Sequence, residues 1–503
     1  MPKKQKNVLL ILTDQHRADH MSCAGNPVVK TPNLDRLAQE GVRFTNAYCA
    51  NPMCMPNRAS IFTGVYPNVH GLRSNGINLP NRVETFVETL RNRGYITYNV
   101  GKMHFNFFIP PFKRKTHSHE MIRYWMHPET AQRARDEFPK PYYGFDECEI
   151  VLGHGDICGG HYLDWLEEKR PGAKEWMRKR MNLDFFQKVC SEAELSVGEF
   201  PTTYCQEKTI SFLERHSKGK YGDKPFFACC SIPDPHHPVT PPGEYRDMYP
   251  DVPLPETFND PNIDNHKFLG PLVKNPVFRG AMLRQTTEEE MKEFMRLTYG
   301  CVSLFDHSIG EILAALEKLG YADDTMVVYT SDHGDLMGDH GMIYKGPSPF
   351  DGVLRVPLIV KAPGVIQSGG VTDALVSSID IAKTILNYAG VSKRWHSRYI
   401  QGVDLAPVLE NPESRVRDSL IIEEDEELGP LDIRLRHLVT EDYKVTVYAG
   451  LEGIGDIYDR KKDPNELNNL WDKEPELREK LFQKLFYEVL NAESKYPARQ
   501  ASS

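Results

Sequence analysis

The chain has 503 residues, 26% of them charged and 40% hydrophobic, with 61 Lys and Arg against 70 Asp and Glu. This composition supports a large buried core and excludes general disorder. The formal net charge of −9 argues against nucleic acid or an anionic membrane as a partner. The longest apolar run, Val8–Leu12, is much shorter than a membrane span.

The N-terminal seven residues are basic, and the apolar stretch after them is too short for the hydrophobic region of a signal peptide. We therefore expect a cytoplasmic protein. Ten cysteines are too few for a disulfide framework in a chain of this length, so most of them should be reduced and buried. A homo-oligomer is expected only because such assemblies are common.

Short apolar runs alternate with amphipathic segments over residues 1–404, which is typical of an α/β domain with a mixed, mainly parallel sheet between helices. Residues 105–205 lack a clear period and are expected to form a loop-rich insertion. Thr287 followed by three glutamates predicts a helix N-terminus, and Gly320 its end. Strands are predicted over 8–13, 95–100, 226–232, 325–331 and 358–361, and helices over 31–41 (with Thr31 as N-cap), 56–63 and 287–319.

The pattern changes after about residue 404. Short strands are predicted over 419–422, 438–441 and 444–448, followed by a charged helix over 475–491. Residues 405–503 are therefore predicted to form a smaller C-terminal α+β domain with a small antiparallel sheet and a terminal helix.

Polar residues follow four of the predicted strands. In open α/β sheets, ligands bind outside the carboxyl ends of the strands. An Asp after one strand is more often a turn former, but four such coincidences at one edge would be unusual. The groups are Asp14 and Gln15, then Lys102 and His104, then Asp234, His236 and His237, and finally Asp332 and His333.

Asp14, Asp332 and the amide oxygen of Gln15 suit a hard divalent cation such as Ca²⁺, Mg²⁺ or Mn²⁺. His333 as a ligand would favour Mn²⁺, although this side chain could bind substrate instead. A simple polar turn over residues 331–335 is the alternative.

Cys54 would lie at the N-terminus of a predicted helix, where the helix dipole favours negative charge, and Arg58 lies one turn further. Both features lower the pKa of a thiol, so a reactive residue is expected here. An ordinary half-buried cysteine is the alternative.

Residues 54–58 read Cys-Met-Pro-Asn-Arg, which resembles the Cys-x-Pro-x-Arg signature of the type I sulfatases of the alkaline phosphatase superfamily. The resemblance implies an alkaline-phosphatase-like fold and a sulfuric ester hydrolase that releases inorganic sulfate and an alcohol or phenol. Further similar stretches follow in the expected order, at 7–15, 31–38, 101–104, 235–238, 331–335, 340–345, 355–360 and 457–466.

Three departures from the family pattern are informative. Asp14-Gln15 and Asp332-His333 resemble the subgroup of choline sulfatases and phosphonate monoester hydrolases, and Asn57 replaces the usual Ser or Ala. The runner-up function is therefore a phosphonate monoester or phosphodiester hydrolase with the same nucleophile. Lys102 and His104 favour the sulfatase, because the phosphonate group usually has uncharged hydroxyl residues there. A catalytically dead metal-binding homologue is a remote alternative.

The resemblance also implies roles for individual residues. A maturation enzyme converts Cys54 to formylglycine, and one hydroxyl of its hydrate, lowered in pKa by the cation and Arg58, attacks the sulfur of a small-molecule sulfate ester. The covalent hemiacetal sulfate then collapses, sulfate leaves and the aldehyde is regenerated. The cation, Ca²⁺ or Mn²⁺, is held by Asp14, Gln15, residue 54, Asp332 and His333.

The remaining implied roles concern charge and protons. Lys102 and Lys345 neutralise the sulfate oxygens, His236 with Lys345 protonates the leaving alkoxide, and His104 takes a proton from the remaining hydroxyl. Asn75 is a further candidate for substrate binding, and an ordinary turn asparagine is an equal alternative. The other histidines of the insertion, at 117, 119, 127, 154 and 161, are expected to be loop residues.

The organic part of the substrate is not readable from the sequence; an aryl, carbohydrate or small alkyl sulfate would each fit. A quaternary ammonium would call for an aromatic or acidic cage. Aromatic residues that could supply one are Tyr124, Trp125, Tyr142, Tyr143 and Trp165, although they could equally pack into a small core of the insertion.

Overall fold

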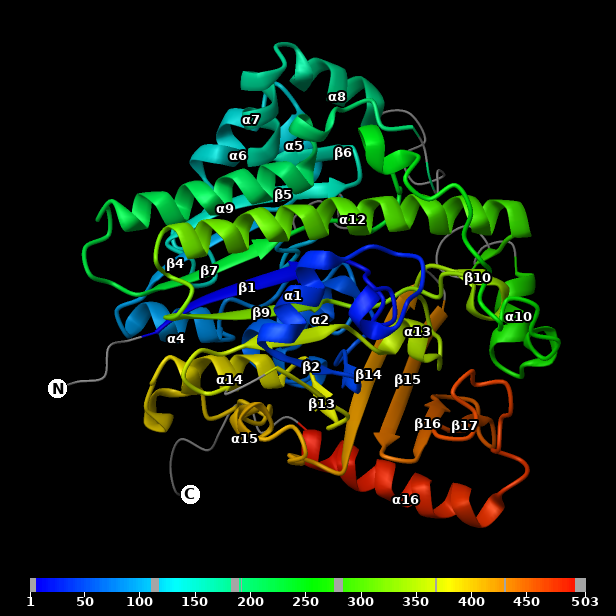
Figure 1. Ribbon diagram of the computed structural model, residues 1–503. Helices are drawn as coiled ribbons and strands as arrows, with labels where there is room; N and C mark the ends of the chain where they lie inside the picture. The colour runs from blue at the N-terminus through cyan, green and yellow to red at the C-terminus, as the bar shows by residue number, and fades with distance from the viewer. Residues whose placement is uncertain are drawn as a thin grey trace.

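A computed structural model describes residues 6–109, 117–181, 190, 192–275, 284–366, 369–428 and 431–493. At its centre is a mixed sheet with the strand order β12-β2-β11-β9-β1-β7-β4-β5-β6 (Figure 1). The neighbouring strands from β9 to β5 are parallel, whereas β11 runs antiparallel to both β9 and β2, and β6 runs antiparallel to β5. The strands are β1 (Asn7–Thr13), β2 (Val42–Phe44), β4 (Ile96–Gly101), β5 (Glu147–His154), β6 (Ile157–Gly160), β7 (Phe226–Ser231), β9 (Thr325–Ser331), β11 (Leu358–Lys361) and β12 (Gly370–Thr372).

Helices cover both faces of this sheet, because its strands are apolar on both sides. On β1, Leu9 and Ile11 enter one hydrophobic core, while Val8, Leu10 and Leu12 enter the other. The first core lies against α1 (Pro32–Glu40), α9 (Pro201–Ser217) and α12 (Glu288–Lys318), and the second against α2 (Cys54–Thr63), α4 (Phe86–Asn92) and α14 (Asp380–Tyr388). The predicted α/β fold with a mainly parallel sheet is therefore confirmed.

Most predicted elements of the N-terminal part agree with the structure to within about two residues. The capping box of α12 is present, since the Thr287 hydroxyl accepts from the Glu290 amide and the Glu290 carboxylate from the Thr287 amide. At α1, in contrast, Thr31 precedes the helix without capping it. Its hydroxyl accepts instead from the amide of Ser22, at 2.9 Å.

Residues 105–205 are more regular than predicted. β5 pairs in parallel with β4, and β6 follows it, so this segment extends the main sheet. The sequence did not indicate this because its short helices are rich in charged and aromatic residues. They are α5 (Ile122–Met126), α6 (Ala131–Asp136), α7 (His161–Lys169) and α8 (Ala173–Met181).

The C-terminal part forms its own antiparallel sheet, in the order β14-β15-β16-β17, with α16 (Pro475–Ala492) beside it (Figure 1). β14 (Ser419–Leu428) and β15 (Leu431–Thr440) are longer than predicted, and β17 (Gly455–Asp459), which follows β16 (Tyr443–Tyr448), was not predicted. The smaller elements are α3 (Pro67–His70), α10 (Leu269–Lys274), α13 (Asp351–Leu354), α15 (Ala406–Glu410), and the strand pairs β3 (Ala47–Tyr48) with β13 (Val376–Ser377) and β8 (Arg284–Gln285) with β10 (Met342–Ile343).

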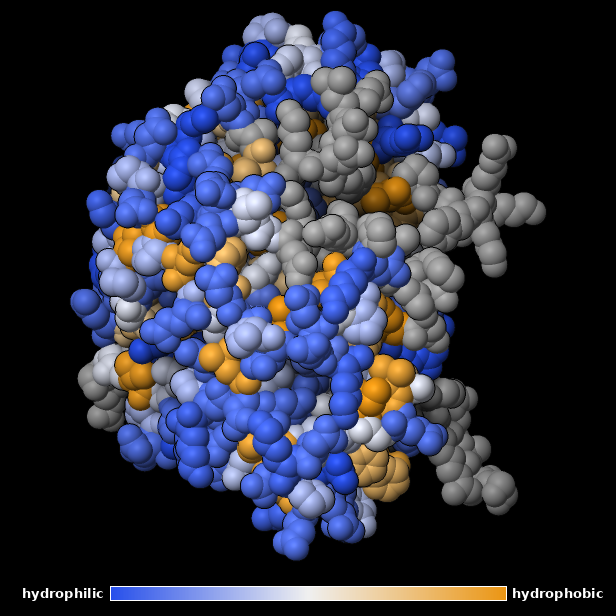
Figure 2. Space-filling view, turned by 90° about the vertical axis from the view of Figure 1, so that its right-hand side faces the viewer, coloured by the Kyte–Doolittle hydropathy of each residue, from blue (hydrophilic) through white to orange (hydrophobic). Residues whose placement is uncertain are grey.

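The face seen in Figure 2 is mainly hydrophilic, with hydrophobic residues in scattered groups. Within the described residues, none of the helices is both long and apolar enough to cross a membrane.

Candidate active site

The sheet register brings the ends of four strands together. Thr13 of β1 lies opposite Ser331 of β9, and Gly101 of β4 lies opposite Ser231 of β7. The residues that follow therefore share one edge: the Asp332 amide donates to the Thr13 carbonyl at 3.2 Å, and the Lys102 amide to the Ser231 carbonyl at 2.9 Å. The predicted groups led by Asp14, Lys102 and Asp332 thus converge as expected. The group after β7 joins them, since the Asp14 amide donates to the Asp234 carbonyl at 3.2 Å.

The first residue of α2 lies against this edge. Asn57, one turn into the helix, accepts hydrogen bonds from the Ala50 amide and the Ser378 hydroxyl and donates to the Asp332 carbonyl. The sequence had marked Asn57 only as a departure from the family pattern. In the structure it fixes the helix that carries Cys54 against the loop that carries Asp332.

Asp14, Cys54, Asp332 and His333 form a buried cluster in which one ligand atom of each lies within 4.8 Å of the others. His333 Nε2 is 3.6 Å from an oxygen of each carboxylate. Its Nδ1 lies 2.8 Å from the Gly334 carbonyl, so Nδ1 carries a proton and donates to that oxygen, and Nε2 is the ring nitrogen that faces the carboxylates.

This donor set fits a divalent cation. The two carboxylates suit Ca²⁺ or Mn²⁺ and the imidazole favours Mn²⁺, whereas the soft sulfur of Cys54 is a poor ligand for either ion. Gln15 also takes part in this network, since its Oε1 accepts a hydrogen bond from Lys345 Nζ at 3.0 Å.

Two buried positively charged side chains, Arg58 and Lys102, contact the carboxylates. Arg58 Nε donates to Asp332 at 2.7 Å and its Nη2 lies 3.4 Å from Asp14, while Lys102 Nζ donates to the same Asp14 oxygen. Burial alone would raise the pKa of Asp14, but Lys102 and Arg58 outweigh it and hold that pKa well below its usual value. The carboxylate is therefore ionised and available to a cation.

The Cys54 thiol is also strongly perturbed. Its sulfur lies 3.0 Å from Lys345 Nζ and 3.1 Å from His333 Nε2. Burial and Asp14 raise the pKa of this thiol, but the positive charges of Lys102, Lys345 and His333 outweigh them and lower it to about 7. The position therefore favours negative charge on residue 54, as the sequence predicted.

Lys345 links residue 54 to the histidines after β7. Its Nζ lies 2.9 Å from His236 Nε2, and His236 Nδ1 lies 2.5 Å from the His237 carbonyl. The Nδ1 proton is thus used by the backbone, and Nε2 accepts from the ammonium. His237 is oriented differently, with its Nδ1 beside the Gln15 amide at 3.1 Å.

His104 is held in a left-handed backbone conformation, with φ of 60°. The buried carboxylate of Glu120 accepts from the amides of His104, Phe105 and Asn106 at 2.6–3.0 Å, and also from the Tyr142 hydroxyl at 2.7 Å. The sequence did not single out Glu120, because its partners are backbone amides that carry no pattern.

The expectation that His154 is a loop residue was wrong. It is the last residue of β5, its Nε2 lies 2.7 Å from Lys102 Nζ, and its ring stacks on His236 with centroids 3.7 Å apart. His161 is not a loop residue either: it is the first residue of α7, and its Nδ1 accepts from the Ile150 amide at 3.0 Å. The sequence could have indicated His154 as a site residue only if β5 had been predicted to end at the same sheet edge as Lys102.

Asn75 lies at the rim of the cluster. Its side chain is exposed, and its Oδ1 accepts from the amide of Met55, the second residue of α2, at 3.2 Å. Two of the five aromatic candidates pack into a small core of the insertion: Trp125 and Tyr142 are buried around Phe138, with centroids 5.7 and 4.6 Å from that ring.

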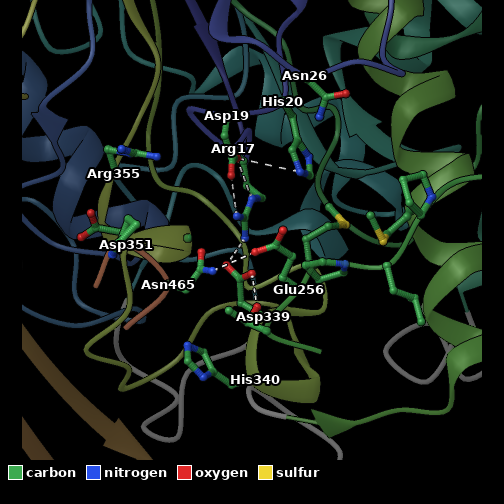
Figure 3. Close-up of a pocket in the computed structure, with 18 of the residues that line it drawn as sticks. Arg17, Asp19, His20, Asn26, Glu256, Asp339, His340, Asp351, Arg355 and Asn465 are labelled. Carbon is green, nitrogen blue, oxygen red and sulfur yellow. Dashed lines mark hydrogen bonds and ion pairs between the residues drawn. The ribbon is translucent and has the colours of Figure 1, made fainter. Parts of the chain in front are cut away.

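A separate cavity of about 430 Å³ lies between the loop after β1 and the C-terminal part (Figure 3). Arg17 is fixed there by Asp19 and Asp339, each at 2.7 Å. The cavity is lined by residues of several loops, and the predicted catalytic residues are not among them. Arg17 thus joins the loop after β1 to residues 335–339, through the Asp335 carbonyl and the Asp339 carboxylate.

The comparisons with known proteins agree with this geometry. A model of the sulfatase family matches residues 6–391. The chain belongs to the sulfatase family. Residues 338–494 also match the C-terminal region of N-sulphoglucosamine sulphohydrolase.

Two relatives and one solved structure are similar to this sulfatase over most of its length. It is 30% identical to an arylsulfatase of Clostridium perfringens over 93% of this chain and 90% of the relative. It is also 30% identical to a multifunctional alkaline phosphatase superfamily protein of Trinickia caryophylli, over 93% and 91%. The phosphonate monoester hydrolase of Agrobacterium radiobacter superposes with a TM-score of 0.78 at 26% identity, covering 98% of this chain and 97% of the other. Family membership makes the sulfatase a sulfuric ester hydrolase.

Proposed function

We propose that the protein hydrolyses small-molecule sulfate monoesters through a formylglycine at position 54 and one divalent cation, Ca²⁺ or Mn²⁺. The observation that carries this proposal is the position of the Cys54 sulfur, 3.0 Å from Lys345 Nζ and 3.1 Å from His333 Nε2. Asp14, Gln15, Asp332 and His333 would hold the cation together with residue 54. A maturation enzyme would act on the Cys54–Arg58 motif.

When present, the hydrated aldehyde supplies a hydroxyl nucleophile and a second hydroxyl that permits release of sulfate, and the cation lowers the pKa of the nucleophile. An unmodified thiol lacks the second hydroxyl. The role of this chain's charged residues is to bind the sulfate group and to move protons around residue 54.

Sulfate oxygens remain negative through the transition state, so fixed positive charge stabilises it. Lys102 contacts Asp14, Lys345 contacts Cys54, and both lysines are buried. In this dry surrounding their attraction to an oxyanion is much stronger than in water. Arg58 is fully engaged with Asp14, Asp332 and backbone oxygen, so we assign it to holding the site and favouring the nucleophile.

The leaving alkoxide needs a proton. Lys345 Nζ donates to His236 Nε2, and burial together with the neighbouring His154 and Lys345 lowers the pKa of His236 well below its usual value. The proton therefore resides on Lys345, and we assign the pair Lys345–His236 as the general acid.

His104 suits the opposite step. Burial and the Lys102 charge lower its pKa well below its usual value, so the ring is neutral and accepts protons. Its Nδ1 is buried without a hydrogen-bond partner among the described residues. We assign it as the base that takes a proton from residue 54 when sulfate is released.

A phosphonate monoester or phosphodiester hydrolase is the second candidate. It is favoured by the likeness to the Agrobacterium enzyme and by the Asp14-Gln15 and Asp332-His333 pairs, which resemble that subgroup. Tetrahedral oxyanions of both kinds would fit the same cationic site, and we infer activity on both with preference for sulfate. Asn75, beside the N-terminus of α2, would contact the substrate in either case.

Mass spectrometry of the tryptic peptide that contains residue 54 tests the nucleophile. Formylglycine is the expected result; active protein with only unmodified Cys54 would contradict the mechanism. Rates with 4-nitrophenyl sulfate and phenyl phosphonate esters then separate the two candidates, and a preference for the phosphonate by orders of magnitude would reverse their ranking. A cytoplasmic location and a homo-oligomer remain predictions from the sequence.

A further inference from the structure

The C-terminal part brings buried acidic side chains close to the active site. β14 carries five consecutive acids, and alternate residues of a strand face opposite sides. Asp425 pairs with Arg436 at 2.7 Å, and Glu427 pairs with Arg73. Glu424 and Glu426 share the other side, and in the described part of the chain neither has a lysine or arginine within ion-pair distance.

Glu426 is the member of this pair that adjoins the catalytic residues. It is 2% exposed, its Oε2 accepts from the Ser74 hydroxyl at 3.3 Å, and its Oε1 has no hydrogen-bond partner among the described residues. The chain after Ser74 leads directly to the nucleophile, since Asn75 accepts from the Met55 amide at 3.2 Å and the Gly76 amide lies 3.2 Å from the Met55 sulfur.

The surroundings of Glu426 are those of an acid without a counter-ion. Burial raises the pKa of this carboxyl to about 8, although the hydroxyl of Ser74 and the backbone of Asn75 lower it, and the charges of Cys54 and Lys345 act on it as well. A buried carboxyl with an unused oxygen costs free energy unless a partner arrives. The cations around Cys54 are already bonded to Asp14, Asp332 and His236.

We propose that Glu426 is a specificity-determining residue that binds a protonated amine on the organic part of the sulfate ester. This inference rests on the proposed function, because it assumes that the sulfate group lies between Lys102 and Lys345. A substrate of this class is itself dipolar. Its anionic end matches the cationic cluster at residue 54, and its ammonium matches the free Oε1 of Glu426, where a charge-assisted hydrogen bond is stronger than one from a hydroxyl.

The test compares two aryl sulfates of similar size, 4-(aminomethyl)phenyl sulfate and 4-ethylphenyl sulfate. For each enzyme, the ratio of the two kcat/KM values is measured, so that differences between the phenols cancel when enzymes are compared. We expect the ratio to be at least about tenfold higher in the wild type than in Glu426→Gln. Glu426→Asp should keep part of the preference, because it keeps the charge.

Glu427→Gln is the matched control. It removes a carboxylate from the neighbouring position, whose side chain is 54% exposed, and should retain the wild-type ratio. The inference is overturned if Glu426→Gln retains the wild-type ratio. It is also overturned if that variant loses activity equally toward both esters, which would indicate a structural role.

Two further measurements keep the result decisive. Thermal unfolding shows whether Glu426→Gln folds. If it does not, the wild type alone is compared on 4-(aminomethyl)phenyl sulfate and 4-(hydroxymethyl)phenyl sulfate, and equal kcat/KM values would refute a preference for charge. Turnover of 4-ethylphenyl sulfate by the wild type tests the proposed function separately. Its absence would refute the sulfatase activity, whereas its presence without amine preference would refute only the role of Glu426.

Discussion

The surroundings of Cys54 and the middle of β14 are both buried and both rich in charge, but they differ in how that charge is balanced. Around Cys54, the carboxylates of Asp14 and Asp332 are bonded to Arg58 and Lys102. On β14, Glu426 keeps an oxygen without a hydrogen-bond partner in the described structure. Buried charges are normally paired. The ion pairs around Cys54 are therefore complete without a ligand, whereas Glu426 can still gain a partner when a ligand binds.

The largest effect is expected from removing the centre of the balanced cluster. Cys54→Ala deletes the nucleophile, and we expect kcat/KM for an aryl sulfate to fall by about 10⁴-fold or more. The fold should persist, because the small side chain leaves the ion pairs of Arg58 intact. Steady-state kinetics and thermal unfolding measure both; substantial remaining activity would contradict nucleophilic catalysis by residue 54.

Removing the cation is expected to be the next most severe change. Chelation should reduce activity by about 10³-fold, because the carboxylates and the nucleophile lose the charge that organises them. Thermal unfolding should shift downward as well, since a ligand that binds only the folded state stabilises it. Adding Ca²⁺ or Mn²⁺ should restore both signals, and Asp332→Asn should prevent the restoration. Unchanged activity and unfolding after chelation would exclude a required cation.

The next largest effect is expected from removing a positively charged side chain of the Cys54 cluster. Lys102→Met leaves Asp14 with one fewer partner in a dry site, and we expect a loss of about 10²- to 10³-fold in kcat/KM. Stability should also fall by roughly 3–5 kcal/mol in the absence of divalent cation, the usual cost of removing one partner of a buried pair. Lys169→Met, which removes a partly exposed pair with Glu207, serves as the control with little effect. Equal behaviour of the two variants would argue against a role for Lys102.

A smaller effect is expected at Glu120, which touches no reacting atom. Glu120→Gln cannot accept from three amides and a hydroxyl as the carboxylate does, so His104 should lose its fixed position and kcat should fall by about 10-fold. A positioning role predicts a change in the pH profile of kcat with a small change in KM. Glu129→Gln, on the exposed surface, is the matched variant and should behave as the wild type.

The smallest effect is expected at the paired acid of β14. Asp425→Asn weakens the ion pair between buried Asp425 and partly exposed Arg436, and should change kcat/KM by less than about twofold because Asp425 faces the side of β14 opposite to Glu426. A loss of kcat/KM as large as that of Glu426→Gln would contradict the proposed difference between the paired acid Asp425 and the unpaired acid Glu426.

The sequence predicted the parts of the fold and site that depend on local pattern. Strand β1, helix α12 and the residues after β1, β4 and β9 follow from apolar runs, caps and the rule that ligands bind at strand ends. His154 was missed, because nothing in an aperiodic segment showed that β5 joins the same sheet. The acids of β14 were missed as strand residues, since a run of five acids is stable in a buried strand only beside distant partners such as Arg73 and Arg436.

One contact of β14 bears on the order of events during synthesis. The Asn51 side chain donates to the Glu423 carbonyl at 2.6 Å, and the Glu423 amide donates to the Ala50 carbonyl at 3.0 Å, across 372 positions of sequence. The segment that leads into Cys54 is thus completed only when the ribosome has produced the last part of the chain. In the folded chain residue 54 is 2% exposed. If a maturation enzyme acts on this residue, as proposed, we expect that enzyme to reach it before the chain has folded completely.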